Sequence, residues 1–211
     1  MSQVLEQTDV VAIVRLNDYS AAVDMVKALA EGGIIATEFT YTNPEAGAAI
    51  ASVKRACGSD VLVGAGTVLD PETARAAILQ GADFLVTPVV SIPTIELARR
   101  YSVPTVIGAF TPTEILTAWQ AGATFVKVFP ASAVGPGYLK DVRGPLPQVK
   151  LIPTGGVNLQ NAGNFIRAGA SAIAVGSNLV DAATVDRKDW GTLTERARAF
   201  VAAVQAARAG A

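Results

Sequence analysis

The amino-acid sequence predicts an α/β protein folded as a compact (β/α)8 barrel. Short β-branched runs alternate with longer segments of helical period, in units of about 20 residues. The strand-like runs are continuously apolar rather than alternating, as in parallel strands that are covered on both faces. Eight such units fill the chain without a linker, so we expect a single barrel domain over residues 1–211. An open doubly wound sheet is the alternative, although eight regular units more often close.

The strands are expected where β-branched and apolar residues cluster. They are predicted at residues 10–15, 34–40, 61–67, 83–87, 104–109, 124–129, 150–154 and 172–176. The segments between them have helical period, and we assign these segments to the outer helices of the barrel.

Proline and glycine mark the ends of the expected helices. Asn43-Pro44, Asp70-Pro71 and Thr111-Pro112 each place proline at a predicted first helical position, behind a side chain that can cap free amides. Glu114 completes a capping box with Thr111. The helices are expected to end at glycines in a left-handed conformation, in the segments 32–33, 81–83, 121–124 and 168–171.

Composition narrows the class of protein. The chain is 51% hydrophobic and 17% charged, as in a globular protein, and its net charge of −1 gives no reason to expect nucleic acid or a membrane as partner. Cys57 is the only cysteine, which excludes an intrachain disulfide and suits a reducing compartment. No secretory signal or membrane span is visible, so a cytoplasmic location is expected.

The complete absence of histidine limits the possible chemistry. It excludes histidine general bases, Ser-His-Asp machinery and metal sites with histidine ligands. Catalysis would then depend on lysine, carboxylate, tyrosine or threonine side chains, or on a bound cofactor.

Polar residues gather where the predicted strands end, which is the functional end of a (β/α)8 barrel. Lys127 interrupts the apolar run FVKVFPA, and it is the only one of the six lysines in the carboxyl-terminal half of a strand. A lysine on the outer face could extend to solvent. Apolar neighbours on both sides favour a desolvated amine of depressed pKa, able to form a Schiff base with a carbonyl.

Glu38 occupies the interior of the second predicted strand. A carboxylate in this position is rarely buried without a partner, so an ion pair with Arg15 or Lys127 is one interpretation. At a barrel mouth the same group can serve as a general base once substrate loosens the pair. Arg15, at the end of the first strand, is either part of a rim salt bridge or a clamp for a carboxylate.

Two glycine-bearing loops follow the seventh and eighth strands. They contain Gly155-Gly156 and Gly176-Ser177. Glycines alone could mark turns. Their place after the last two strands favours backbone amides that converge on a phosphate.

The motifs GAGTV (64–68), TPTE (111–114), FVKVFPA (125–131), PTGGV (153–157) and AVGSNL (174–179) stand in the order found in one family. The chain resembles, over nearly its whole length, the 2-keto-3-deoxy-6-phosphogluconate (KDPG) and 4-hydroxy-2-oxoglutarate (KHG) aldolases. The resemblance implies a class I aldolase, usually a homotrimer, that releases pyruvate from a small keto-acid substrate, a 2-keto-3-deoxy acid such as KDPG, with no metal and no cofactor. It leaves open the C4 epimer, 2-keto-3-deoxy-6-phosphogalactonate, as substrate.

The resemblance also implies roles for individual residues. Lys127 is similar in position to the Schiff-base lysine and Glu38 to the acid/base. Substrate-binding positions fall on Thr67, which would face the pyruvyl carboxylate, and on Phe129, beside the lysine; the phosphate cradle falls on Gly155, Gly156, Gly176 and Ser177.

Two further substrate-binding positions differ from the family pattern. Thr42 stands where many members carry an arginine, so Arg15 would have to supply that charge. Thr87-Pro88 stands where Ser-Pro is usual after the fourth strand. These differences bear on substrate preference.

Two rival functions fit the same barrel. A phosphosugar isomerase or epimerase would need paired acid/base groups or a metal, and neither histidine nor an acidic cluster is present. A phosphate-binding sensor without turnover would not need the lysine and the glutamate.

Overall fold

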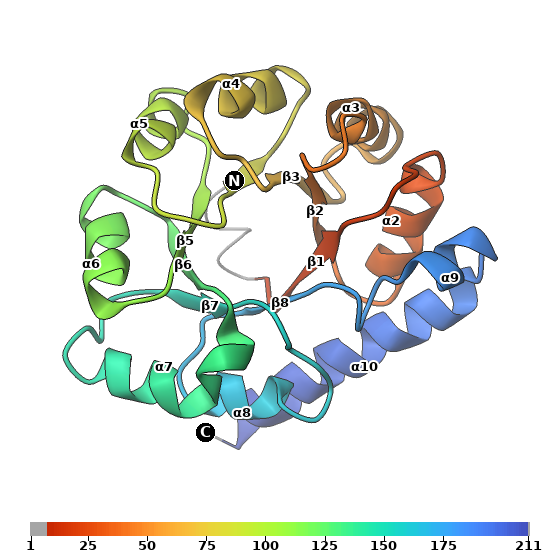
Figure 1. Ribbon diagram of the computed structural model, residues 1–211. Coiled ribbons are helices and arrows are strands. Elements are labelled where there is room, and N and C mark those ends of the chain that lie inside the picture. Colours follow the sequence, from red (N-terminus) through yellow and green to blue (C-terminus); the bar gives the residue numbers. More distant parts are fainter. Residues whose placement is uncertain (1–7, 211) are drawn as a thin grey trace.

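The computed structural model describes residues 8–210, which form a barrel of eight parallel strands inside a ring of helices (Figure 1). The strands are β1 (Val10–Val14), β2 (Ala36–Thr40), β3 (Leu62–Gly66), β4 (Phe84–Val86), β5 (Thr105–Ala109), β6 (Phe125–Val128), β7 (Leu151–Pro153) and β8 (Ile173–Val175). Each lies within its predicted range. Strands β1 to β7 pair in chain order, and β8 pairs with β1.

The barrel is closed between β7 and β8 by an isolated parallel bridge, in which Thr154 faces Ala174. Every other neighbouring pair of strands shares a longer ladder. The fold is therefore a TIM-type (β/α)8 barrel, and the open-sheet alternative is wrong.

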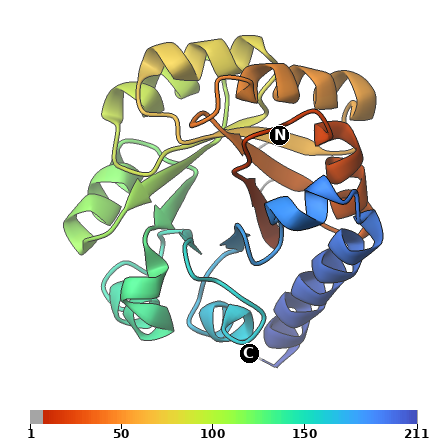
Figure 2. The same ribbon diagram turned by 45° about the vertical axis from the view of Figure 1, so that its right-hand side comes forward.

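The helices lie outside the strands, as the turned view also shows (Figure 2). They are α2 (Ala22–Glu31), α3 (Ala46–Cys57), α4 (Pro71–Leu79), α5 (Ile92–Arg100), α6 (Pro112–Gln120), α7 (Gly135–Arg143), α8 (Ala162–Arg167), α9 (Ala182–Asp186) and α10 (Trp190–Ala209), with a 3-10 turn η1 (Ala131–Ala133) before α7. Within residues 8–210, no helix has both the length and the apolar character needed to cross a bilayer.

Two of the three predicted helix starts are confirmed. Asp70 accepts a hydrogen bond from the Thr73 amide, and Thr111 forms the predicted capping box with Glu114. The third is wrong, because α3 begins at Ala46, two residues after Pro44. Asn43 still accepts a hydrogen bond from the backbone N–H of Glu45, the residue before α3, and its side-chain amide donates to the carbonyls of Leu16 and Asn17, which fixes the loop after β2 to the loop after β1.

The predicted glycine stops are confirmed at four helix ends. Gly33, Gly81, Gly122 and Gly169 have φ angles of 92°, 95°, 100° and 95°, in the left-handed region that glycine adopts without a steric penalty. Each turn directs the chain from an outer helix into the next strand.

Two apolar layers hold the molecule together. Large side chains such as Leu29, Ile50 and Phe165 fill the space between strands and helices. The barrel interior holds a second cluster, to which Phe84 and Phe125 contribute their rings. Gly64 makes room for the Phe84 ring, since a Cβ at Gly64 would lie 2.4 Å from that ring.

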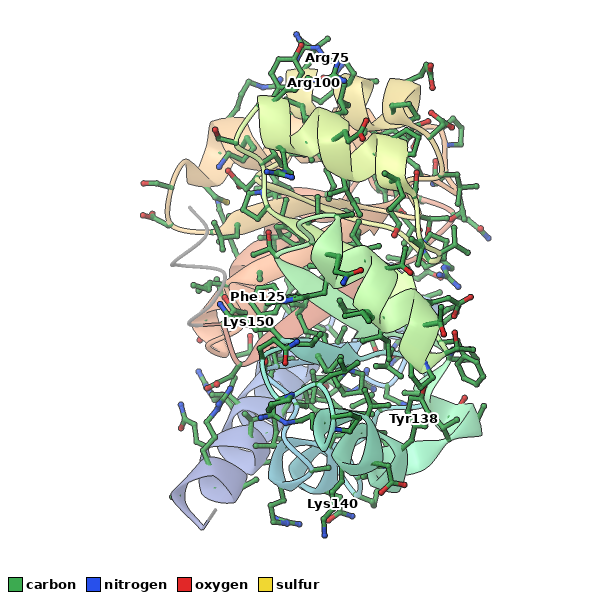
Figure 3. The ribbon with its side chains drawn as sticks, turned by 90° about the vertical axis from the view of Figure 1, so that its left-hand side faces the viewer. Arg75, Arg100, Phe125, Tyr138, Lys140 and Lys150 are labelled. Atoms are coloured by element: carbon green, nitrogen blue, oxygen red, sulfur yellow. The ribbon has the colours of Figure 1, made fainter. Side chains whose placement is uncertain are left out.

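Lys150 lies at the end of the barrel where the strands begin. A side view shows Phe125 and Lys150 near one end and Tyr138 toward the other (Figure 3). Lys150 precedes β7, and its amine lies 5.8 Å from the centroid of the Phe125 ring. Lys150 is thus at the end opposite to the carboxyl ends of the strands, as its position in the sequence predicts.

Candidate active site

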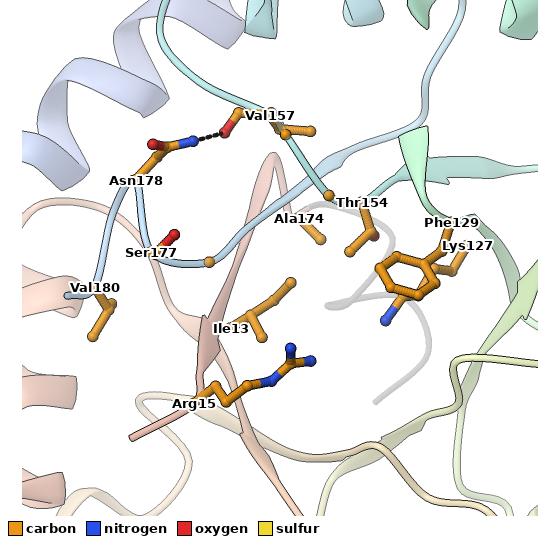
Figure 4. Close-up of a pocket in the computed structure, with 13 residues that line it drawn as sticks. Ile13, Arg15, Lys127, Phe129, Thr154, Val157, Ala174, Ser177, Asn178 and Val180 are labelled. Carbon is orange, nitrogen blue, oxygen red and sulfur yellow. Dashed lines mark hydrogen bonds between the residues drawn. The ribbon is translucent and has the colours of Figure 1, made fainter. Parts of the chain in front are cut away.

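A cavity of about 300 Å³ opens where β6, β7, β8 and β1 end (Figure 4). It brings together seven of the residues expected from the sequence. These are Arg15, Lys127, Phe129, Gly155, Gly156, Gly176 and Ser177. Its position at the carboxyl ends of the strands is where (β/α)8 barrels place their sites.

Lys127 projects inward from β6 into this cavity. Side chains alternate along a strand, so Phe125, Lys127 and Phe129 face the same side. Lys127 is only 6% exposed, and its amine lies 4.9 Å from the centroid of the Phe129 ring. The residue that interrupts the apolar run is therefore directed into the barrel, and the alternative of an outer-face lysine is wrong.

Burial lowers the pKa of Lys127, because the charged amine loses hydration; the nearby Glu38 carboxylate raises it again, and Arg15 lowers it further. The combined effect is a pKa below that of an exposed lysine. A larger fraction of Lys127 is then neutral near pH 7, and only the neutral amine is a nucleophile.

Glu38 projects from β2 into the same interior and is 2% exposed. Burial raises its pKa, against the opposing effects of Lys127 and Arg15. Among residues 8–210, its Oε2 has no hydrogen-bond partner, and it forms no ion pair with Lys127 or Arg15 within 4.0 Å. The ion-pair interpretation is wrong in this structure, so the carboxyl group is available for another partner.

A space of about 10 Å³ lies between Glu38 and Lys127 and is also lined by Thr154. This is about the volume that one water molecule needs. Gly66 leaves room for the carboxyl group, because a Cβ there would lie 3.0 Å from the Glu38 Cδ. Glu38 on β2, Lys127 on β6 and Thr154 just after β7 thus meet at one small space, whose other lining side chains are apolar.

Arg15 follows the last residue of β1 and is exposed at the rim of the cavity. Its guanidinium points toward the side where Lys127 and Phe129 lie (Figure 4). In the described part of the chain it has no salt-bridge partner, which excludes the rim salt bridge. A free guanidinium in this place can bind an anion.

Three of the expected substrate-binding residues do not line the cavity. Thr42 is exposed, shares a hydrogen bond of 2.9 Å with Thr40, and lines a neighbouring depression that also includes Arg15. The backbone of Pro88 lies against Gly108 of β5, because a Cβ on Gly108 would lie 2.2 Å from the carbonyl carbon of Pro88.

Thr67 is half-buried just after β3. Its φ of 56° is unusual for a β-branched residue and costs about 1–3 kcal/mol. Strain of this kind concentrates at functional sites, so Thr67 remains a candidate on its own evidence.

The two glycine loops present free backbone donors to the cavity. Gly155 and Gly156 have φ angles of 91° and 74°, which glycine alone adopts readily. The amides of Gly156, Val157 and Ser177 form no hydrogen bond within residues 8–210. Converging free amides are a binding site for an anion.

Thr154 and Asn178 are site residues that the sequence analysis did not single out. Thr154 is 3% exposed, its hydroxyl has no hydrogen-bond partner among the described residues, and it lines both cavities. Alternation from Ile152 along the seventh strand could have placed it inward. The contact of Asn178 with Val157 crosses two loops, and no local pattern indicates it.

A barrel with a buried lysine and a set of backbone amides, none of them paired within the described part of the chain, has the layout of an enzyme that acts on an anionic carbonyl compound. The model of the KDPG and KHG aldolase family matches residues 1–196 of the chain. The chain belongs to this family, and it is an aldolase, a carbon–carbon lyase.

Individual relatives agree with this assignment. The chain is 35% identical over 199 residues to the 2-dehydro-3-deoxy-6-phosphogalactonate aldolase of Escherichia coli, covering 93% of this chain and 95% of that protein. It is 33% identical over 193 residues to the 2-dehydro-3-deoxy-phosphogluconate aldolase of Treponema pallidum, covering 91% of both. The KDPG aldolase of Legionella pneumophila, solved with pyruvate as a covalent carbinolamine, has a TM-score of 0.88 and 27% identity, covering 94% of this chain and 97% of that one.

Proposed function

We propose that the protein is a Schiff-base aldolase that cleaves a phosphorylated 2-keto-3-deoxy acid to pyruvate and an aldehyde, with glyceraldehyde 3-phosphate as the aldehyde. The observation that carries this proposal is the placement of Lys127, whose amine is buried in the cavity and has no carboxylate of residues 8–210 within ion-pair distance. The covalent pyruvate adduct of the Legionella pneumophila relative supports it.

The reaction begins when the neutral amine of Lys127 adds to the substrate ketone at C2. The carbinolamine loses water and becomes an iminium, which is an electron sink. Glu38, acting through water in the space that both residues line, takes the proton from the C4 hydroxyl. The C3–C4 bond breaks, its electron pair forms the enamine of pyruvate, and C4 becomes the aldehyde. Protonation of the enamine at C3 and hydrolysis then release pyruvate and the free lysine.

The remaining groups would bind the two anionic ends of the substrate. The amides of Gly156, Val157 and Ser177 suit the phosphate, because they are free donors on two converging loops. The guanidinium of Arg15 suits an anionic group at the rim, in place of the arginine that many relatives carry at the position of Thr42. Thr154, with a buried free hydroxyl, is suited to a substrate hydroxyl or to the reacting oxygen.

Relatives named for the gluconate and for the galactonate compound both match this chain, so both C4 epimers are candidate substrates. The unphosphorylated 4-hydroxy-2-oxoglutarate is a third. The test is a panel of the three substrates, with released pyruvate as the readout and EDTA in parallel. We expect the highest kcat/KM on one of the phosphorylated acids, and we expect EDTA to leave this value unchanged. Isomerised substrate without pyruvate would contradict the proposal.

We also propose a homotrimer in the cytoplasm. One solved structure that is 32% identical is a cage designed by fusing symmetric oligomeric domains, which supports oligomerisation. Exposed apolar side chains support it as well: Leu69, Val89 and Phe110 follow β3, β4 and β5 and are 58%, 54% and 36% exposed. The single cysteine suits a reducing compartment.

A further inference from the structure

The loop after β7 is held by asparagine side chains rather than by a strand ladder. The amide group of Asn161 donates to the Gly156 carbonyl at 2.9 Å and accepts from the Asn158 backbone N–H at 2.8 Å. The Asn158 side chain makes a second, longer bond to the Gly156 carbonyl, at 3.4 Å. Asn178, on the loop after β8, donates to the Val157 carbonyl at 2.8 Å, as Figure 4 shows.

These contacts decide which way two peptide groups face. In a trans peptide the C=O and the N–H point in opposite directions. The Gly156 carbonyl turns toward Asn161, which does not line the cavity. The N–H of the same peptide belongs to Val157, which does line it, and this N–H has no hydrogen-bond partner in residues 8–210. Asn161 therefore directs a free donor toward the cavity.

The next peptide is fixed at both of its polar groups. Asn178 binds the Val157 carbonyl, and Asn161 binds the Asn158 N–H. This ties the loop after β7 to the loop after β8 at the place where only one isolated bridge joins the two strands. The loop after β7 carries the amides of Gly156 and Val157, and the loop after β8 carries the amide of Ser177. The hydrogen bond between Asn178 and Val157 therefore sets the distance between these two groups of donors.

We infer that Asn161 and Asn178 are positioning residues that hold these amides in register for a phosphate group. Asn161 does not line the cavity and so acts on a ligand only through the loop, whereas Asn178 lines the cavity and its side-chain amide is already bound to the Val157 carbonyl. Their loss would let the glycine loop turn a carbonyl toward the anion, because Gly155 and Gly156 adopt many backbone conformations. The inference rests on the proposed function, since it names residues that shape the proposed phosphate site.

The experiment compares Asn161→Ala and Asn178→Ala with Asn164→Ala as the matched control. Asn164 lies on α8 near the same loop, but its side chain accepts from Arg167 and binds neither glycine loop. The readouts are inhibition by inorganic phosphate and the ratio of kcat/KM for the phosphorylated acid to that for 4-hydroxy-2-oxoglutarate.

Each of the two test variants should weaken phosphate inhibition and lower the kcat/KM ratio by about fivefold to tenfold, the effect of one lost hydrogen bond. The change should fall mainly on KM of the phosphorylated acid, and Asn164→Ala should match the wild type. Should Asn161→Ala not fold, Asn178→Ala decides the question alone.

Two outcomes would overturn the inference, and they are distinguishable. In the first outcome, folded Asn178→Ala has the same phosphate inhibition and the same kcat/KM ratio as the wild type. This result would reject the positioning role and leave the proposed function standing. A wild type that neither binds phosphate nor prefers the phosphorylated acid would reject the phosphate site of the proposed function, and the positioning role with it.

Discussion

Glu38 and Lys127 act on each other's proton affinity across a small shared space. Burial raises the pKa of Glu38 and lowers the pKa of Lys127, because it disfavours the charged form of each group. The charge of each group opposes this effect, because it stabilises the charged form of the other. The protonation states of the two groups are therefore coupled, and shifted pKa values of this kind are typical of acid/base and nucleophilic residues.

Glu38→Gln should slow cleavage by about 10²–10⁴, the usual loss on removing a general acid/base. It should also lower the pKa of Lys127, because the carboxylate that raises this pKa is gone. Since the neutral amine is the nucleophile, the acid limb of the pyruvate-trapping rate should move to lower pH. The measurement is kcat together with the trapping rate against pH. Near-normal kcat would reduce Glu38 to a neighbouring charge.

Gly176 offers a direct test of the phosphate site. A Cβ at this position would meet no heavy atom within 4 Å, and Gly176 lines the cavity. Gly176→Ala should therefore fold normally and obstruct only a ligand, so kcat/KM for the phosphorylated acid should fall by more than that for 4-hydroxy-2-oxoglutarate.

The control for this change is Gly191→Ala on α10, which also enters open space but lies outside the cavity. Gly156 would be a poor choice, because its φ is 74° and a Cβ would lie 2.6 Å from the Ser132 Cβ. Equal losses on both substrates in Gly176→Ala would mean that this loop does not hold phosphate.

At the level of elements, Asp181 fixes the start of α9 to α10. It accepts hydrogen bonds from the backbone and the hydroxyl of Thr184, and it is paired with Arg196. Burial raises the pKa of Asp181, but these partners outweigh it and lower the pKa from 3.8 to about 2. The carboxylate thus adds stability above pH 3.8, and this stability is lost as the pH falls toward 2.

Asp181→Ala should therefore cost about 1–2 kcal/mol at neutral pH, as for the loss of a capping residue. The difference in unfolding free energy from the wild type should shrink as the pH falls through this range. Urea unfolding at several pH values measures it, with Asp186→Ala on the same helix as control. A difference independent of pH would show that the charge of Asp181 is not the cause.

The strands could be predicted from the sequence because their apolar, β-branched runs are local signals, and the buried lysine was visible for the same reason. The start of α3 could not be predicted, because Asn43 binds carbonyls of the β1 loop, which lies 26 residues or more earlier in the chain. Thr154, Asn161 and Asn178 could not be predicted for a similar reason. Their roles follow from a closed barrel that brings β7 and β8 together.

At the level of the whole molecule, we expect association of three chains. Large apolar side chains are exposed on three successive loops, and burying them against a partner chain would be favourable. Sedimentation equilibrium should therefore give a mass three times 21.7 kDa. A mass of one chain at assay concentrations would reject the trimer.

We expect the amine of Lys127 to form the covalent bond with the substrate. The measurement is reduction by borohydride in the presence of pyruvate, followed by peptide mass spectrometry. One reduced pyruvyl group per chain is expected, on the peptide that contains Lys127, and none should form in Lys127→Arg. Lys150 serves as the internal comparison, because it lies at the opposite end of the same barrel. A label on Lys150, or an enzyme that is active but unlabelled, would contradict covalent catalysis by Lys127.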